Sequence, residues 1–543
     1  MADPRGGQAD SATLVALIAF TLISLLLGFI ANRAGSRSGF LASYFLGNRS
    51  MGAVAMALTA AVMSGGTFMG FPSLVYSFGW VVGLWIASYM VAPLTVMGVL
   101  GKRIGQLSRR TGAITLPDLM RERYDSPALG LLTSLLVTGF LSCSLVAQFK
   151  AGTLILQMVL PASWSAWATP EMLGGVDPRY AVGLAIFTAT VVAYTAYGGF
   201  LAAIWTDIFQ SLIMAVGVAI LLPLALMHSG GLGAATERGM EVAGPGFAFG
   251  PGAGRDFLAP GLAFSFFVMW AISGMGQPST LVRLMAFRDS RTLRWAILYQ
   301  SAYNALIYIP LVLIFIAARG ILPGLERPDE VMPRLVITLA NPYVAGLILA
   351  APYGAVMSTV SGFLLIVASG LVRDLYSRFL RPAASEREIA RASYLATAGV
   401  GAAAAMMALR DVTFLQLIVV FASAGMASAF LAPALLGAFW RRATAPGALA
   451  AMAAGSAVTL VLYCLGSFPS ILGIGDQGIG PKPQAFGAYY LFGCEPCVWG
   501  ILTSFAVGIA VSLATAPPDP RLVSRLFDRP EVGGAKGLAP ASA

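Results

Sequence analysis

Long apolar segments follow one another along almost the whole chain, with short polar loops between them. A helix needs about 20 apolar residues to cross the hydrocarbon core of a bilayer. Scanning at that length predicts thirteen membrane-spanning helices. Their expected bounds are 13–32, 51–77, 80–101, 127–160, 180–198, 203–228, 258–282, 294–318, 335–375, 392–409, 413–439, 446–466 and 496–515. The pattern therefore predicts an all-α polytopic membrane protein.

The second predicted span is interrupted by small and polar residues. Ser64, Gly65, Gly66 and Thr67 lie in the middle of the apolar segment TAAVMSGGTFMGFP. In hydrocarbon, backbone groups that leave a helix must be bonded by neighbouring protein or by water in a cavity. Secondary transporters bind ions and solutes at broken helices near the membrane midplane. We therefore expect these four residues to contact a transported substrate.

The seventh predicted span carries a similar interruption. Gly274, Gln277 and Pro278 follow Trp270 within an otherwise apolar run, and proline removes a backbone donor. Glycine and proline are also common in unbroken membrane helices. Two interrupted spans that are five apart, however, indicate a pair of five-helix repeats of inverted topology. We expect all four residues to contact the substrate.

The ninth predicted span offers oxygen atoms on one face. Ala355, Ser358 and Thr359 are spaced i, i+3 and i+4, so they lie on the same side of a helix. Together with carbonyls freed in the second span, they would form a neutral site suited to a monovalent cation such as sodium, since divalent ions normally require carboxylates. Alternatively, the two hydroxyls bond to carbonyls of their own helix or across to a neighbouring helix.

One basic residue, Lys150, lies inside the fourth predicted span. An ionisable side chain at membrane depth is a candidate functional group. Its ammonium group could meet a substrate carboxylate, or it could extend along apolar surface to the membrane interface.

The composition agrees with a membrane protein. Charged residues make up 11% of the 543 residues, against about 25% in soluble proteins. With the N-terminus outside, 24 of the 34 Lys and Arg residues fall in inward segments and nine in outward segments. Because basic residues favour cytoplasmic loops, this predicts an outside N-terminus and a cytoplasmic C-terminus. It also explains the net charge of +10 without a nucleic-acid partner.

Catalytic chemistry has few candidate residues. His228 is the single histidine, so a Ser–His or imidazole-metal centre of a membrane hydrolase is not expected, and we predict that the protein is not an enzyme. A transporter-like sensor would need a signalling domain, and the segment after Pro517 is short. Cys494 and Cys497 form a CxxC pattern at the outer entrance of the last span, where a local disulfide and two free thiols are the alternatives.

Five separate stretches carry a family resemblance. They are SYFLGNRSMG, TLPDLMRERY, YGGFLAAIWTDIFQ, GQPSTLVRLMAFRDS, and APYGAVMSTVSGFLL with VRDLY, between Ser43 and Tyr376. In combination they resemble the sodium:solute symporter family. The resemblance implies a ten-helix inverted-repeat core, broken helices in spans two and seven, and sodium as the co-transported ion.

The resemblance also implies which residues bind the ion. The sodium ligands would be the carbonyls of Ala60, Met63 and Ala355 and the hydroxyls of Ser358 and Thr359. Asp207 resembles the family's acidic residue on the cytoplasmic side of the cation path; alternatively, it caps the sixth span near the surface.

Two departures bear on the substrate. The proline carriers of the family have an aspartate and an aromatic residue where this chain has Val62 and Gly274. The span-nine segment LAAP..A.MST is similar to the pantothenate-permease branch. The predicted function is sodium-coupled import of a small organic anion such as pantothenate. The alternative is sodium- or proton-coupled symport of short monocarboxylates or another small solute.

The expected organisation follows the repeats. Residues 1–33 hold an N-terminal periplasmic segment and the first span, 34–228 the first repeat, 229–440 the second repeat, 441–515 two further spans and 516–543 a cytoplasmic tail. The expected location is the bacterial inner membrane. The lipid bilayer and the solute are the expected partners, and a small membrane subunit is a further candidate.

Overall fold

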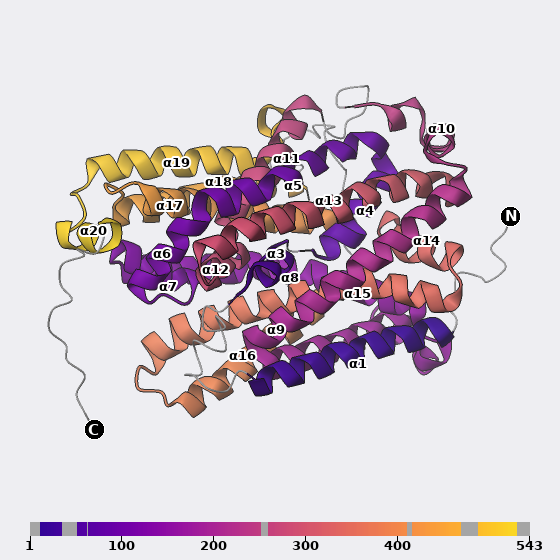
Figure 1. Ribbon diagram of the computed structural model, residues 1–543, viewed down its shortest axis with the longest axis horizontal. Helices are drawn as coiled ribbons and strands as arrows, with labels where there is room; N and C mark the ends of the chain where they lie inside the picture. The colour runs from indigo at the N-terminus through magenta and orange to yellow at the C-terminus, as the bar shows by residue number, and fades with distance from the viewer. Residues whose placement is uncertain are drawn as a thin grey trace.

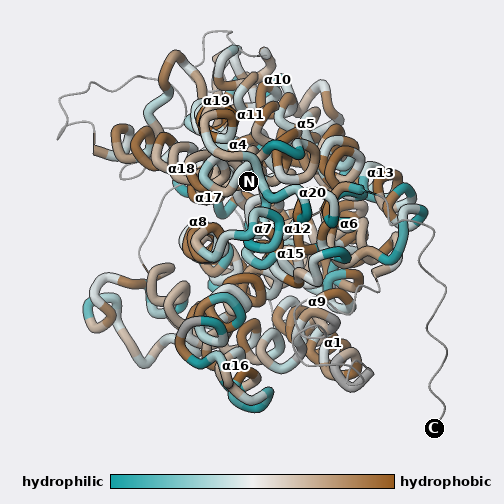
Figure 2. The backbone as a smooth tube through the Cα atoms, turned by 90° about the vertical axis from the view of Figure 1, so that its left-hand side faces the viewer, coloured by the Kyte–Doolittle hydropathy of each residue, from teal (hydrophilic) through white to brown (hydrophobic). Residues whose placement is uncertain are grey.

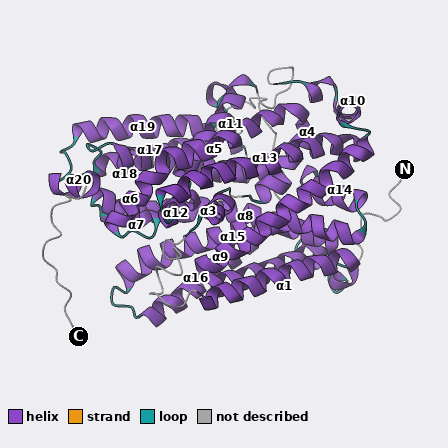
Figure 3. Cartoon of the chain, in the orientation of Figure 1, coloured by secondary structure: helices purple, strands orange, loops and turns teal. Residues whose placement is uncertain are grey.

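The apolar segments form helices that lie side by side along one common direction (Figures 1 and 3). The computed structural model describes residues 11–34, 51–61, 63–250, 259–409, 415–468 and 487–528. The α-helices are α1 (Ser11–Ala34), α3 (Ala53–Ala60), α4 (Phe71–Phe78), α5 (Gly83–Pro93), α6 (Lys102–Thr111), α7 (Leu116–Tyr124), α8 (Pro127–Val159), α9 (Pro178–Ser229), α10 (Leu232–Ala243), α11 (Pro260–Ile272), α12 (Pro278–Ala286), α13 (Ser290–Ile321), α14 (Val331–Leu339), α15 (Pro342–Ser369), α16 (Glu386–Ala408), α17 (Leu415–Phe439), α18 (Ala445–Ser467), α19 (Pro496–Ala514) and α20 (Pro520–Phe527). Shorter π or 3₁₀ turns are η2 (Gly66–Gly70), η3 (Gly79–Val82), η4 (Leu94–Gly101), η5 (Ala162–Ser165), η6 (Glu171–Leu173), η7 (Pro245–Ala248), η8 (Ser273–Gly276), η9 (Pro328–Glu330), η10 (Gly370–Leu380) and η11 (Leu491–Gly493). The predicted all-α class is confirmed.

The predicted number of thirteen spans is not confirmed. Ten helical stretches of the described chain are long and apolar enough to cross a membrane. The predicted second span is split between α3 and a continuous helical run, Gly66–Thr111, that also holds the third. The predicted seventh span is split at η8. The predicted tenth span corresponds to α16, which is rich in alanine and glycine and is not among the ten. The predicted fifth and sixth spans correspond to Pro178–Tyr197 and Ala202–Ser229, two separate stretches of α9 on either side of the non-helical backbone at Gly199 (φ 60°).

The helix ends gather at two opposite ends of the molecule. α10 and α14, which follow the predicted sixth and eighth spans, lie at one end, whereas α6, α7 and α20 lie at the other (Figure 1). Figure 2 looks onto this second end and shows hydrophilic residues around α7 and α20. Segments predicted to share a membrane side therefore lie together.

The two broken spans run in opposite directions. Met51, just before α3, pairs with Phe287, just after α12: its N–H donates to the Ala286 carbonyl and its carbonyl accepts from the Arg288 N–H, both at 3.3 Å. The chain thus enters the first broken span beside the point where it leaves the second. Figure 1 shows α4 and α11 toward the opposite end, which is the arrangement expected of inverted repeats.

Gly79 lets the chain turn between the second and third predicted spans. Its φ of 77° is in the left-handed region, and a Cβ there would overlap the carbonyl oxygen of Phe247. We expect Gly79→Ala to lower the free energy of unfolding by about 2 kcal/mol or more, measured as a reduced thermal midpoint of the purified protein. Gly139→Ala is the matched control, since a Cβ on this α8 glycine meets open space. Equal midpoints for both variants would contradict this account.

Candidate functional site

The first break is held by side chains that replace helical hydrogen bonds. α3 ends at Ala60 and η2 begins at Gly66. Between them, the Ser64 N–H donates to the Thr67 hydroxyl at 3.3 Å, and the Gly66 N–H donates to the Ser64 hydroxyl at 3.1 Å. The Gly65 N–H donates to Oε1 of Gln148 on α8 at 2.7 Å. The polar residues of this segment therefore satisfy the backbone groups that the break releases.

Glycine at position 65 also allows close packing. A Cβ on Gly65 would lie 2.6 Å from the Ala151 Cβ and 2.9 Å from Oε1 of Gln148. The break thus packs directly against α8, and a larger residue would push the two segments apart.

The expected cation ligands meet where this break touches α15. The Thr359 hydroxyl lies 2.8 Å from the Met63 carbonyl oxygen and 3.0 Å from that of Ala355. The Ser358 hydroxyl lies 3.0 Å from the same Ala355 carbonyl. Both hydroxyls therefore bond to a carbonyl of their own helix, and the Thr359 hydroxyl also donates to the freed Met63 carbonyl of the broken span. Ala60, the last residue of α3, lines a cavity together with Thr359.

The second break joins α11 to α12 through η8. The Gln277 amide donates to the Ser423 carbonyl of α17 at 3.2 Å. Gly274 faces Val96, since a Cβ there would lie 2.7 Å from the Val96 side chain. Pro278 begins α12, a position where the missing N–H leaves no helical bond unmade.

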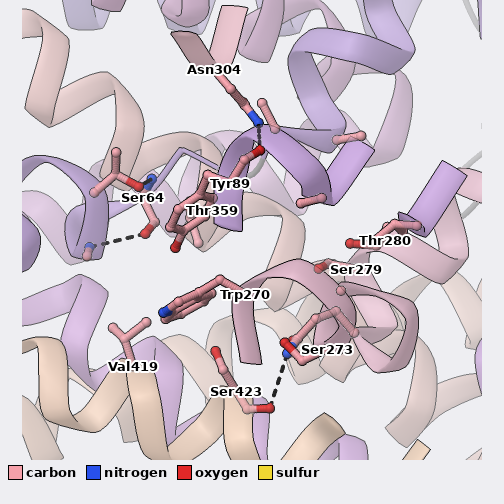
Figure 4. A pocket seen from close by; sticks show the side chains of 18 of the residues that line it. Ser64, Tyr89, Trp270, Ser273, Ser279, Thr280, Asn304, Thr359, Val419 and Ser423 are labelled. Atoms are coloured by element: carbon pink, nitrogen blue, oxygen red, sulfur yellow. Dashed lines mark hydrogen bonds between the residues drawn. The ribbon is translucent and has the colours of Figure 1, made fainter. Parts of the chain in front are cut away.

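A cavity of about 130 Å³ lies between the two breaks. Of the residues predicted to contact substrate, Ser64, Gly66, Thr67, Trp270, Gly274 and Gln277 line it. Gly65, Pro278 and Lys150 are not among the residues that line it. Figure 4 shows the Trp270 indole lying across the cavity, with Tyr89 and Thr359 on one side and Ser423 on the other.

Aromatic rings form one wall of this cavity, and the sequence reasoning identified only Trp270 among them. Trp270 stacks on Trp85 with ring centroids 5.7 Å apart and on Tyr89 at 5.2 Å. Tyr89 in turn stacks on Tyr308 at 4.3 Å, and the Tyr308 hydroxyl lies 3.2 Å from that of Thr67. α5 and α13 supply the added rings. Their sequence signal is weak, because tryptophan and tyrosine in a span usually indicate the membrane interface.

Lys150 is buried in α8, and the residue is 6% exposed. Its neighbour Gln148 reaches the cavity instead and bonds to the first break. The burial does not fit an ammonium group that extends to the interface.

Asp207 is buried as well and pairs with Arg283. The carboxylate of Asp207 on α9 lies 3.8 Å from the guanidinium of Arg283 on α12, and both residues are under 10% exposed. Asp207 is therefore not a surface cap of the sixth span. Arg283 follows the predicted end of the seventh span at residue 282 and was therefore expected in the next inward loop, but it lies in α12, the buried second half of that broken span.

The remaining candidates lie away from the cavity. Cys494 and Cys497 are free thiols, and His228 is exposed near the end of α9. Val62 lies outside the described residues, as do the basic residues Arg37, Arg49, Arg255 and Lys482 and the tail after residue 528.

Comparison with known proteins agrees with this arrangement. The sodium:solute symporter family matches residues 44–455. The sodium/pantothenate symporter of Escherichia coli K12 is 33% identical over 460 residues, covering 83% of this chain and 90% of that protein. The high-affinity proline transporter PutP of Bacillus subtilis is 30% identical, covering 80% of this chain and 89% of that protein. A substrate-bound, outward-open structure of a Na⁺-coupled sialic acid symporter shares the fold, with a TM-score of 0.67 and 16% identity over 94% of this chain and 99% of that one.

The chain is a multi-pass membrane transporter and belongs to the sodium:solute symporter family. Sodium is its co-transported ion.

Proposed function

We propose that the protein imports a small carboxylate, with pantothenate as the leading candidate, in symport with sodium bound between the first break and α15. The proposed ligands are the carbonyls of Ala60, Met63 and Ala355 and the hydroxyls of Ser358 and Thr359. The observation that carries this proposal is the Thr359 hydroxyl, which lies within 3.0 Å of carbonyl oxygens from both elements. Neutral oxygens from two segments suit a weakly held monovalent cation.

The coupling follows from the position of the proposed site. Sodium would join the broken span to α15, and Thr359 and Ala60 also line the solute cavity. An ion that ties these segments together raises the population of the state that can hold solute. An inward membrane potential adds about 2.3 kcal/mol per charge per 100 mV to import.

The proposed substrate class has support from two sides. The sodium/pantothenate symporters of Escherichia coli and Haemophilus influenzae are 33% and 31% identical to this chain over most of its length. The proline carriers have an aromatic residue where this chain has Gly274, and here Val96 packs directly against that glycine, so proline is disfavoured. Lys150 does not line the cavity, so the carboxylate would rely on neutral donors and on sodium.

We also infer the membrane placement and domain division. Residues 34–228 and 229–440 would form the two inverted repeats, residues 441–515 two additional spans, and the N-terminus would lie outside the bacterial plasma membrane. Two points support this: the excess of basic residues at one set of loops and the gathering of those loops at one end of the molecule.

Uptake by reconstituted protein tests the proposal. We expect an inward sodium gradient to raise uptake of pantothenate at least about tenfold over equal sodium on both sides, since coupling energies of 1–3 kcal/mol change affinities 5–150-fold. Acetate, pyruvate, proline and a neutral sugar complete the panel. Uptake of the sugar alone would overturn the carboxylate proposal, and uptake that responds only to a proton gradient would overturn sodium coupling.

A further inference from the structure

Five buried polar atoms around the cavity lack a hydrogen-bond partner within the described part of the chain. They are the side-chain carbonyl oxygens of Gln300, Asn304 and Gln416 and the indole N–H groups of Trp85 and Trp270. All five residues line the cavity. A buried donor or acceptor without a partner costs about 1–3 kcal/mol, so a cavity with five of them is built for an occupant that bonds to them.

The acceptors cannot readily turn away. The Asn304 amide nitrogen donates to the Tyr89 carbonyl at 2.9 Å, which directs its oxygen away from α5 (Figure 4). Oε1 of Gln416 lies against the first broken span, where a Cβ on Gly66 would come within 3.0 Å of it. Gln300 is one helical turn from Asn304 on α13, so their side chains lie on the same face of that helix.

Charge is absent from this lining. Among the described residues around the cavity there is no Lys, Arg, His, Asp or Glu. The two indole N–H groups and nearby hydroxyls such as Ser64 and Thr67 can donate to a carboxylate. The three amide oxygens can only accept, so they require O–H or N–H groups on the solute.

We propose that the cavity selects carboxylates that also carry hydroxyl or amide N–H groups, and that it rejects short monocarboxylates that lack them. This inference rests on the proposed function and deepens it. A site that hydrogen-bonds a substrate O–H or N–H strongly rejects an analogue without that group, because the buried acceptors are then left unpaired. An apolar pocket, which distinguishes solutes by size, discriminates much less.

Competition for sodium-dependent pantothenate uptake tests the selectivity. Pantothenate carries hydroxyl and amide donors, so an analogue of it that lacks both hydroxyls keeps the carboxylate and nearly the same size. We expect the analogue to compete about tenfold or more weakly, and acetate or pyruvate about 100-fold or more weakly. Equal competition by the analogue or by acetate would overturn the inference and leave sodium symport intact. Absence of sodium-stimulated uptake for every solute would overturn the proposed function, and this inference with it.

Variants assign the selectivity to the unpaired oxygens. Gln300→Met and Gln416→Met remove an acceptor at nearly constant volume, and each should reduce the preference for pantothenate over its analogue about tenfold. Gln210→Met is the matched control, because Gln210 is a buried, unpartnered amide on α9 that does not line the cavity. The preference should stay unchanged in this control. An unchanged preference in both cavity variants would contradict the role of the amide oxygens, whatever their effect on protein yield.

Discussion

Thr359→Ala is expected to abolish sodium-stimulated uptake at physiological sodium concentrations. The hydroxyl lies 2.8 Å from the Met63 carbonyl and 3.0 Å from the Ala355 carbonyl. Its removal deletes one ligand of the proposed site and also the hydrogen bond that joins α15 to the first break. Interactions with a charged group contribute about 1.5–3 kcal/mol, which predicts a rise of about 10–150-fold in the sodium concentration for half-maximal uptake. Initial uptake rates measured over a sodium series provide this value.

Three variants separate loss of the ligand from loss of the fold. Thr359→Ser keeps the hydroxyl and should retain most of the sodium response. Thr338→Ala removes a hydroxyl that bonds to its own helix through the Arg334 carbonyl at 2.9 Å, in α14 and away from the site, and should leave the response unchanged. The Ser358→Ala/Thr359→Ala pair should show none. An unaltered sodium requirement in that double variant would refute the proposed site.

The fold was predictable because hydrocarbon restricts the choices of the chain. Apolar segments of membrane length must be helical, since their backbone groups have no other partners, and the two interruptions marked where helices break. The extent of the spans was less accessible. The predicted boundaries after residues 77 and 198 lie beside Gly79 and Gly199, whose φ angles are positive. The helical run Gly66–Thr111, however, continues about ten residues past the predicted end of the third span at residue 101, because polar residues can extend a helix beyond the apolar segment that hydropathy reports.

The candidate site was predictable to a different degree in its two parts. The face of Ala355, Ser358 and Thr359 followed from helical spacing alone. The residues that contact this face and line the cavity come from segments that are distant in the sequence. Gln416, for example, packs against Gly66 although about 350 residues separate the two along the chain. A glutamine in an apolar helix shows that a polar group is buried, but not which broken helix it faces.

Arg283 illustrates the same difficulty for charge. The predicted seventh span ends at residue 282, so Arg283 was expected in the inward loop that follows. In the structure it is held in α12 by the Asp207 carboxylate at 3.8 Å and by the Ser279 carbonyl at 3.0 Å. Only the fold brings α9 beside α12, so the pair could not be inferred from the positions of the two residues in the sequence.

Asp207→Asn is expected to reduce sodium-stimulated uptake strongly and to destabilise the protein. Removing one member of a buried ion pair leaves the other charge uncompensated, which costs about 3–5 kcal/mol. Asp207 also borders a small cavity that contains Met63, Ser358 and Thr359, and its Oδ1 atom has no hydrogen-bond partner within the described chain. We therefore expect the carboxylate both to pair with Arg283 and to attract a cation that leaves the proposed site.

The double variant Asp207→Asn/Arg283→Met distinguishes these two roles. It removes both charges, so the thermal midpoint should recover most of the loss seen in Asp207→Asn. If the carboxylate also serves the cation path, uptake should remain low and the sodium concentration for half-maximal uptake should remain high, because no anion is left beside Ser358 and Thr359. Recovery of the sodium response together with stability would show that Asp207 acts only as the partner of Arg283. We expect recovery of the midpoint alone, since the free oxygen of Asp207 borders the same small cavity as the proposed ligands.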